Sequence, residues 1–126
     1  MTPLAEAVYE ILRLRTSRPD PRITYAELAE ELREAADDFL HITHRSQQLY
    51  AALGEVGRAC RRLSLPLLPA LVVRADTRRP GEAYYEGTSA GLVYKGEKVA
   101  AWRREVAAVK EKRYPKRKRR PGSATS

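Results

Sequence analysis

Hydrophobic and polar positions alternate most regularly between Ser46 and Leu63, and this pattern predicts a helix. Apolar residues recur there every three or four positions, which is the period of a helix with one buried face; they are Leu49, Leu53, Val56, Cys60 and Leu63. The opposite side of the same helix carries polar or small residues, namely Gln47, Gly54, Arg58, Arg61 and Arg62. One side of this helix can therefore be buried while the other presents cations and amides to a partner.

Two further helices are predicted before this one. The first covers Pro3 to Leu14, because Thr2 can cap it and proline is favoured at the first helical position. Its expected buried stripe is Leu4, Val8, Ile11 and Leu12. The second helix follows Thr24, which forms a capping box with Glu27. Its expected exposed face is acidic and consists of Glu27, Glu30, Glu31 and Glu34.

The pattern changes after Leu63. Prolines end the helical period, and residues 70–73 (ALVV) predict a short buried strand. Pro80-Gly81 indicates a turn, so residues 83–85 are expected to return as a second strand of a hairpin with its loop at residues 74–81. A last helix is predicted over residues 97–113, with an apolar face of Val99, Trp102, Val106 and Val109. Residues 37–45 fit either an extension of the second helix or an irregular connector.

The order of these elements predicts an α+β fold. Three helices, a short β-hairpin and a C-terminal helix are the sequence pattern of a winged-helix-like domain, in which the second and third helices form a helix-turn-helix and the hairpin is the wing. We expect this domain to cover residues 1–113. Residues 114–126 have neither apolar content nor periodicity and are expected to form a disordered basic tail.

The charge of the chain is positive and unevenly distributed. The 126 residues carry a formal net charge of +8. From Lys110 onward there are eight basic residues against one acidic residue, whereas residues 1–44 sum to −4 and residues 45–109 to +5. A polyanion is therefore expected to meet the second half of the domain and the tail.

These charges and the helix at residues 46–63 predict a nucleic-acid partner, and we favour duplex DNA. Arginine can pair with guanine edges, glutamine can pair with adenine, and either can hold a phosphate. The candidate contacts of the helix and the loop are Gln47, Gln48, Arg58, Arg61, Arg62, Arg74, Arg78 and Arg79. The tail would add salt-sensitive affinity without sequence preference through Lys116, Arg117, Lys118, Arg119 and Arg120.

Other chemistry has little support in the sequence. The only cluster with metal-ligand character consists of Asp37, Asp38, His41 and His44. A metal site usually needs a further ligand from elsewhere in the chain, and the chain has no histidine besides His41 and His44. We therefore expect no metal and no cofactor. The single cysteine, Cys60, lies on an apolar stripe and is interpreted as a small buried residue. One cysteine also excludes an internal disulfide and favours a reducing cytoplasm. No apolar run is long enough to cross a membrane.

The order of the motifs also resembles the C-terminal DNA-binding domain of the alkyltransferases and alkyltransferase-like proteins. The resemblance is carried by ITYAELAEEL, LYAALGEVGRACRRLSLPLLPALVV, PGEAYY and KGEKVAAWRREV. Thr24-Tyr25 and Leu28-Ala29 match that family's first motif, and Gly54 matches the glycine of its recognition helix. The resemblance implies that Tyr25 contacts DNA, because the family's tyrosine helps to rotate a nucleotide out of the duplex. The family's Pro-Cys-His-Arg motif is absent, so alkyl transfer is not implied.

A second resemblance covers residues 23–106. The run LGEVGRACRRLSLPLLPALVVRADTRRPGEAYY is similar to a group of small uncharacterised bacterial proteins that combine TYxELA with LPxLxALVV. This resemblance implies a bacterial domain and no particular activity.

We favour a non-catalytic DNA-binding protein, and two other classes of function remain open. One is a nucleic-acid-processing enzyme such as a nuclease, with its site at residues 37–44 or near Tyr25. The other is a protein-interaction subunit of a defence or toxin system, whose hairpin would contact a partner protein.

Overall fold

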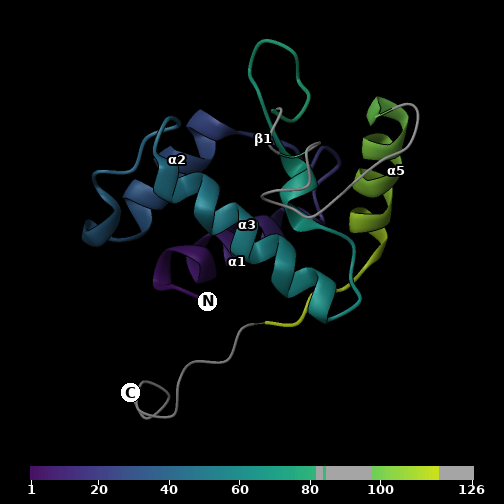
Figure 1. Ribbon diagram of the computed structural model, residues 1–126, viewed down its shortest axis with the longest axis horizontal. Helices are drawn as coiled ribbons and strands as arrows, with labels where there is room; N and C mark the ends of the chain where they lie inside the picture. The colour runs from purple at the N-terminus through teal and green to yellow at the C-terminus, as the bar shows by residue number, and fades with distance from the viewer. Residues whose placement is uncertain (82–83, 85–97, 117–126) are drawn as a thin grey trace.

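The computed structural model describes residues 1–81, 84 and 98–116 and shows a mixed α+β fold (Figure 1). Helices dominate the described part, and only two very short strands occur in it. The elements in chain order are α1 (Pro3–Arg15), β1 (Ile23–Thr24), α2 (Tyr25–Ala35), the 3-10 helix η1 (Asp37–Phe39), α3 (Gln47–Arg62), the 3-10 helix η2 (Leu68–Leu71), β2 (Val72–Val73) and α5 (Lys98–Glu111).

The first two helices begin where their capping residues predict. The Thr2 hydroxyl accepts a hydrogen bond from the Ala5 amide at 3.1 Å. At the start of α2, the Glu27 amide donates to the Thr24 hydroxyl at 3.1 Å, and the Thr24 amide donates to the Glu27 carboxylate at 3.0 Å. The bond from the Thr24 amide to the carboxylate is the main cause that holds the pKa of Glu27 below its ordinary value. Both predicted N-termini are therefore confirmed.

Helix α3 is more deeply buried than its sequence pattern predicts. Four of the five predicted stripe residues are buried, but Leu63 is 48% exposed because the helix ends at Arg62 and Ser64 turns the chain with a φ of 56°. Gly54, which was expected on the partner-facing side, is buried together with Gly57. The placement of Gly54 on the exposed side of the helix is therefore wrong.

The small sheet differs from the predicted hairpin. Strand β2 pairs in parallel with β1, with Ile23 opposite Val72 and Thr24 opposite Val73. Only the last two residues of the predicted strand 70–73 are extended, because η2 begins at Leu68 and includes Ala70 and Leu71. Tyr84 is helical, and its neighbours Ala83 and Tyr85 lie outside the described residues. The predicted antiparallel wing is therefore not present in the described part of the chain, where β2 takes its partner from before α2.

Residues 74–79 form a tight loop that projects from the end of β2 (Figure 1). The Arg74 amide donates to the Arg79 carbonyl at 2.8 Å, and the Arg78 amide donates to the Arg74 carbonyl at 2.9 Å. Arg78 adopts the left-handed conformation, with a φ of 58°, which closes the turn. The chain thus reverses within residues 74–79. The sequence pattern placed the turn later, at Pro80-Gly81.

Helix α5 closes the core beside η2. Trp102 is only 3% exposed, and its indole Nε1 donates to the Ala70 carbonyl at 2.7 Å. Val109 is fully buried, Val99 and Val106 pack against the core, and the Glu105 carboxylate accepts from the Leu67 amide at 2.7 Å. The predicted apolar face of the last helix is confirmed.

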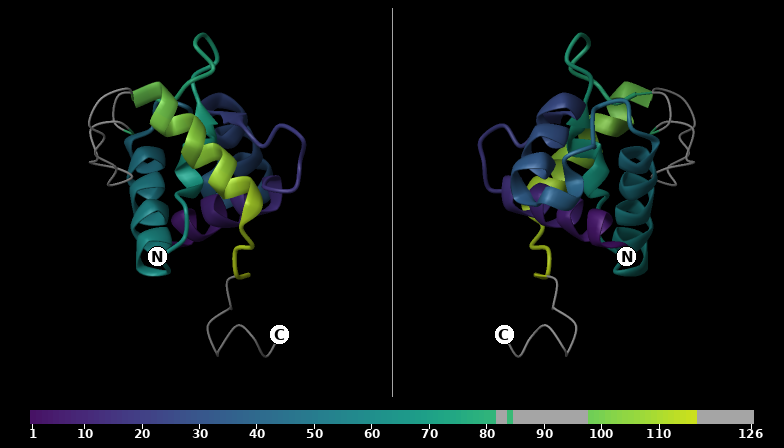
Figure 2. Two further views of the ribbon diagram at one scale, coloured as in Figure 1. Left: turned by 90° about the vertical axis from the view of Figure 1, so that its right-hand side faces the viewer. Right: turned by 90° about the vertical axis from the view of Figure 1, so that its left-hand side faces the viewer.

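The packed domain continues beyond Arg113, where the sequence placed its end. Tyr114 is 7% exposed and donates to the Pro66 carbonyl at 2.5 Å. The Tyr9 hydroxyl donates to the Pro115 carbonyl at 2.6 Å. Burial raises the pKa of Tyr114 well above its ordinary value. These contacts fix the chain where it leaves the end of the molecule opposite to the 74–79 loop (Figure 2).

Within the described ranges, no helix is both long enough and apolar enough to cross a membrane.

The indole bond to Ala70 gives a test of this packing. Replacing Trp102 with Phe leaves a buried carbonyl without its donor, so we expect the free energy of unfolding to fall by about 1–3 kcal/mol. Urea denaturation followed by circular dichroism measures this change. The exposed neighbour substitution Arg104→Ala should alter the free energy of unfolding by less than about 0.5 kcal/mol. Equal urea midpoints for Trp102→Phe and the unchanged protein would contradict the packing described.

Candidate nucleic-acid interface

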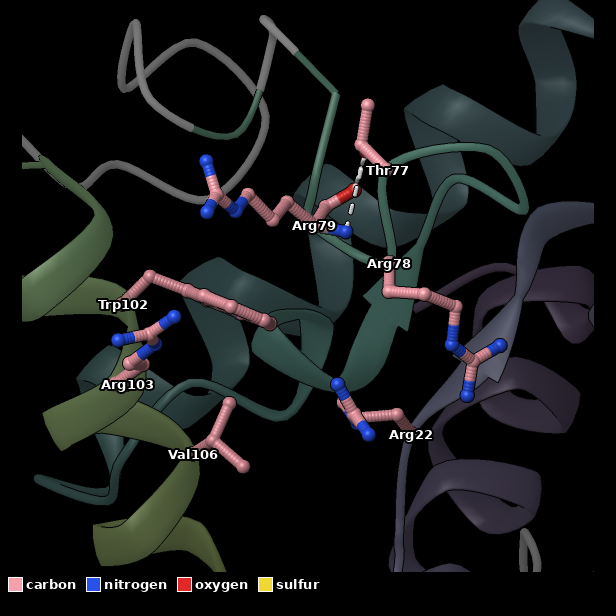
Figure 3. A pocket seen from close by; sticks show the side chains of 7 residues that line it. All are labelled: Arg22, Thr77, Arg78, Arg79, Trp102, Arg103 and Val106. Carbon is pink, nitrogen blue, oxygen red and sulfur yellow. Dashed lines mark hydrogen bonds between the residues drawn. The ribbon is translucent and has the colours of Figure 1, made fainter.

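Four arginines line one hollow beside the projecting loop (Figure 3). The hollow has a volume of about 320 Å³. We call it the arginine hollow. Its lining residues are Arg22, Thr77, Arg78, Arg79, Trp102, Arg103 and Val106. Two of these arginines, Arg78 and Arg79, are predicted contact residues, whereas Arg22 and Arg103 were not identified from the sequence.

The parallel pairing of β1 with β2 brings these arginines together. Arg22 directly precedes β1, and the loop that carries Arg78 and Arg79 directly follows β2. Helix α5 supplies Arg103, together with Trp102, whose indole is fixed by its bond to Ala70. The lining of the hollow therefore combines an aromatic side chain held in place, Trp102, and an aliphatic one, Val106, with the four arginines.

The charges around the arginine hollow are unbalanced. The Asp20 carboxylate accepts two hydrogen bonds from the Arg22 guanidinium, both at 2.9 Å. Arg78 lies farther from the same carboxylate, at 3.8 Å, and Figure 3 shows its side chain directed away from the other arginines. Within the described ranges, the side chains of Arg79 and Arg103 have no carboxylate partner. Asp20 is therefore shared by Arg22 and Arg78, Arg79 and Arg103 have no carboxylate partner in the described ranges, and the hollow is positive.

Positive charge continues along α5 from this hollow. Arg103, Val106 and Lys110 are spaced three and four residues apart, so they share one face of the helix. The Lys110 ammonium donates to the Pro19 carbonyl at 2.9 Å, which places this face beside the loop between α1 and β1. Arg18 in that loop is exposed. The arginine hollow is thus the most concave part of a longer basic surface.

The predicted contacts of α3 lie apart from this surface. All five, Gln47, Gln48, Arg58, Arg61 and Arg62, are exposed as predicted. Glu55 lies between the glutamines and the arginines and accepts a hydrogen bond from the Thr2 amide at 3.0 Å. The helix slopes away from the projecting loop, so its arginine-bearing end is remote from that loop (Figures 1 and 2). Its arginines and those of the loop therefore form two separate basic regions.

Tyr25 and Arg74 line a different hollow on another side of the loop. The Tyr25 hydroxyl accepts a hydrogen bond from the Gly81 amide at 3.2 Å. Arg74 is paired with Asp76 through two bonds of 3.1 and 2.9 Å. Lys116 of the predicted tail is exposed. The remaining predicted tail contacts, Arg117, Lys118, Arg119 and Arg120, lie outside the described residues.

Arg22 and Arg103 were missed because their grouping depends on tertiary structure. Arg22 precedes a capping box and carries no periodic signal of its own. The spacing of Arg103, Val106 and Lys110 predicts a shared face of a helix, but not what lies opposite that face. Arg22 and Arg103 come close to Arg78 and Arg79 only in the folded chain, where α5 lies beside the segment before β1 and the segment after β2.

Other candidate chemistry does not converge on a site. The segment at residues 37–45 is a 3-10 turn followed by irregular chain, so His41 and His44 do not share a helix face and line different hollows. Among the residues that the structure describes, no group of three His, Cys, Asp or Glu side chains could hold a metal ion. Cys60 is buried, and that burial raises the pKa of its thiol and disfavours the reactive thiolate.

The ion pair at the edge of the arginine hollow has a pH signature. The bonds from Arg22 hold the pKa of Asp20 at about 2, below its ordinary value of 3.8. Because the folded-state pKa is the lower one, the pair stabilises the fold above about pH 4, and this contribution is lost as the pH falls from about 4 to about 2.

We expect an NMR titration of the Asp20 carboxyl carbon to give a midpoint at about pH 2. Arg22→Ala should move the midpoint towards 3.8, whereas Arg78→Ala should move it much less, because Arg78 lies 3.8 Å from the carboxylate. Equal shifts in the two variants, or a midpoint near 3.8 in the unchanged protein, would contradict this assignment.

Comparison of the chain with protein-family models, with curated proteins and with solved structures finds no match.

Proposed function

We propose that this protein binds nucleic acid without catalysis, with duplex DNA as the favoured partner, and that the arginine hollow holds the phosphate backbone. The observation that carries this proposal is that four arginines line one hollow, while Asp20 is the one carboxylate paired with any of them among the residues that the structure describes. Like charges at such close quarters repel one another, and a polyanion relieves that repulsion.

The chemistry of arginine favours phosphate as the ligand. A guanidinium presents a planar fork of N–H donors that matches two oxygens of a phosphate. Arg79 and Arg103 are exposed and have no carboxylate to displace among the described residues. These two side chains are therefore the primary phosphate contacts of the proposal, while Arg22 and Arg78 shape the field around them.

The remaining basic segments have secondary roles in this proposal. The projecting 74–79 loop takes the place of the wing in a winged-helix-like arrangement, and it enters the groove or follows the backbone beside the hollow. The arginines at the end of α3 and the residues from Lys116 onward form the second basic region. They add electrostatic affinity without sequence preference.

Matched double variants test which basic region binds. Arg79→Ala with Arg103→Ala removes two phosphate contacts, so we expect the affinity for a blunt DNA duplex at low salt to fall at least about tenfold. The slope of log affinity against log salt concentration should decrease in magnitude by about 1.8. Fluorescence anisotropy with a labelled duplex at several salt concentrations measures both quantities.

The control variant Arg58→Ala with Arg61→Ala removes the same charge from α3, and we expect it to weaken binding by less than about threefold. Asp20→Asn removes the carboxylate that pairs with Arg22 and Arg78, and it should strengthen binding. A larger loss in the α3 variant than in the hollow variant would refute the hollow as the main site and would favour α3. No binding of the unchanged protein at low salt would refute the function itself.

A further inference from the structure

A second hollow, lined by two tyrosines, lies on another side of the projecting loop from the arginine hollow. We call it the tyrosine hollow, and its volume is about 710 Å³. Four segments line it: the start of α2, the residues before α3, one residue of α3 and the loop. The lining residues are Thr24, Tyr25, Ala26, His44, Arg45, Tyr50, Arg74, Ala75, Asp76 and Gly81.

The two tyrosine rings are held in fixed positions. Their centroids are 5.6 Å apart and their planes are tilted by 49°, so the rings contact each other without stacking in parallel. The Tyr50 hydroxyl donates to the His44 carbonyl at 2.9 Å, and the Tyr25 hydroxyl accepts from the Gly81 amide at 3.2 Å. Tyr50 remains 37% exposed, although aromatic residues are usually more buried. A preformed aromatic surface is thus open to the hollow.

The charges at the rim of the tyrosine hollow suit a nucleotide. Arg45 is exposed, and its side chain has no ion-pair partner among the described residues, so it is available for a phosphate. Arg74 is held by Asp76 through two hydrogen bonds. The Asp76 carboxylate disfavours a phosphate inside the hollow but can accept hydrogen bonds from a base. This distribution predicts a base inside and its phosphate at Arg45.

Small side chains leave room for a flat ring beside the tyrosines. Ala26 and Ala75 are both exposed and contribute only a methyl group each to the lining. A volume of about 710 Å³ lies within the range of about 300–1,000 Å³ that is usual for small-molecule sites. Every base has a flat aromatic face, so stacking on a tyrosine is tolerant of sequence.

We propose that the tyrosine hollow holds one unpaired nucleobase of the bound nucleic acid, stacked on Tyr50. This inference rests on the proposed function, and it adds a preference for duplex with an unpaired nucleotide at its end. The two hollows are separated by a single turn of the loop, because the Arg78 amide donates to the Arg74 carbonyl at 2.9 Å. In this inference, a duplex held at the arginine hollow, which Arg78 lines, places its unpaired end in the hollow that Arg74 and Tyr50 line.

The experiment compares a blunt duplex with the same duplex carrying one unpaired 2-aminopurine nucleotide at one end. Loss of one base stacked on an aromatic side chain costs on the order of tenfold in affinity. We expect the full chain to bind the overhang duplex at least about fivefold more tightly, and to quench the 2-aminopurine fluorescence as the base stacks.

Two substitutions at Tyr50 separate stacking from the hydrogen bond to His44. Tyr50→Leu should abolish both the preference and the quenching, while the affinity for blunt duplex stays unchanged. Tyr50→Phe keeps the ring and should retain both. Tyr50 is exposed, so neither substitution is expected to unfold the protein, and circular dichroism checks this.

The outcomes distinguish this inference from the proposed function. Tight binding of both duplexes without preference or quenching overturns the inference and leaves the proposed function standing. A preference that persists in Tyr50→Leu also overturns it. Binding of neither duplex at low salt overturns the inference together with the proposed function.

Discussion

The parallel pairing of two residues in β1 with two in β2 determines the surface described here. Thr24 is opposite Val73, so the start of α2 and the start of the projecting loop leave the sheet side by side. Arg22, just before β1, consequently lies near Arg78 and Arg79, just after β2. Tyr25, just after β1, lies near Arg74 for the same reason. Both hollows thus depend on one short ladder, whose register determines which side chains before and after the strands come together.

The ladder is itself held by the helices around it. Ile23, Val72 and Val73 are buried in the core, and η2 leads directly into β2. Trp102 of α5 donates to Ala70 in η2, so the helix that contributes Arg103 also fixes the segment that leads into the loop. Tyr114 adds a second tie through Pro66. The backbone positions that carry these arginines are therefore set by core packing.

Local signals in the sequence predicted much of this fold. The capping residues Thr2 and Thr24 and the apolar periods gave the helices, because these features act within a few residues. The parallel ladder could not be predicted, since β1 is two residues long and its partner lies almost fifty residues later. Gly54 was misplaced because a small residue without a charge fits either side of a helix. Tyr114 was assigned to the tail because a lone aromatic residue next to a basic run has no period.

For the candidate site, Arg78 and Arg79 were selected from local charge, whereas Arg22, Arg103 and Tyr50 required tertiary structure.

The central claim is that the nucleic-acid surface is centred on the arginine hollow. An NMR titration of the full chain with a short DNA duplex tests it most directly, with the arginine Nε–Hε signals as the probe. The account predicts that the largest shifts occur at Arg22, Arg79 and Arg103, with smaller shifts at the end of α3. Large shifts confined to Arg58, Arg61 and Arg62, with those of Arg79 and Arg103 unmoved, would contradict it.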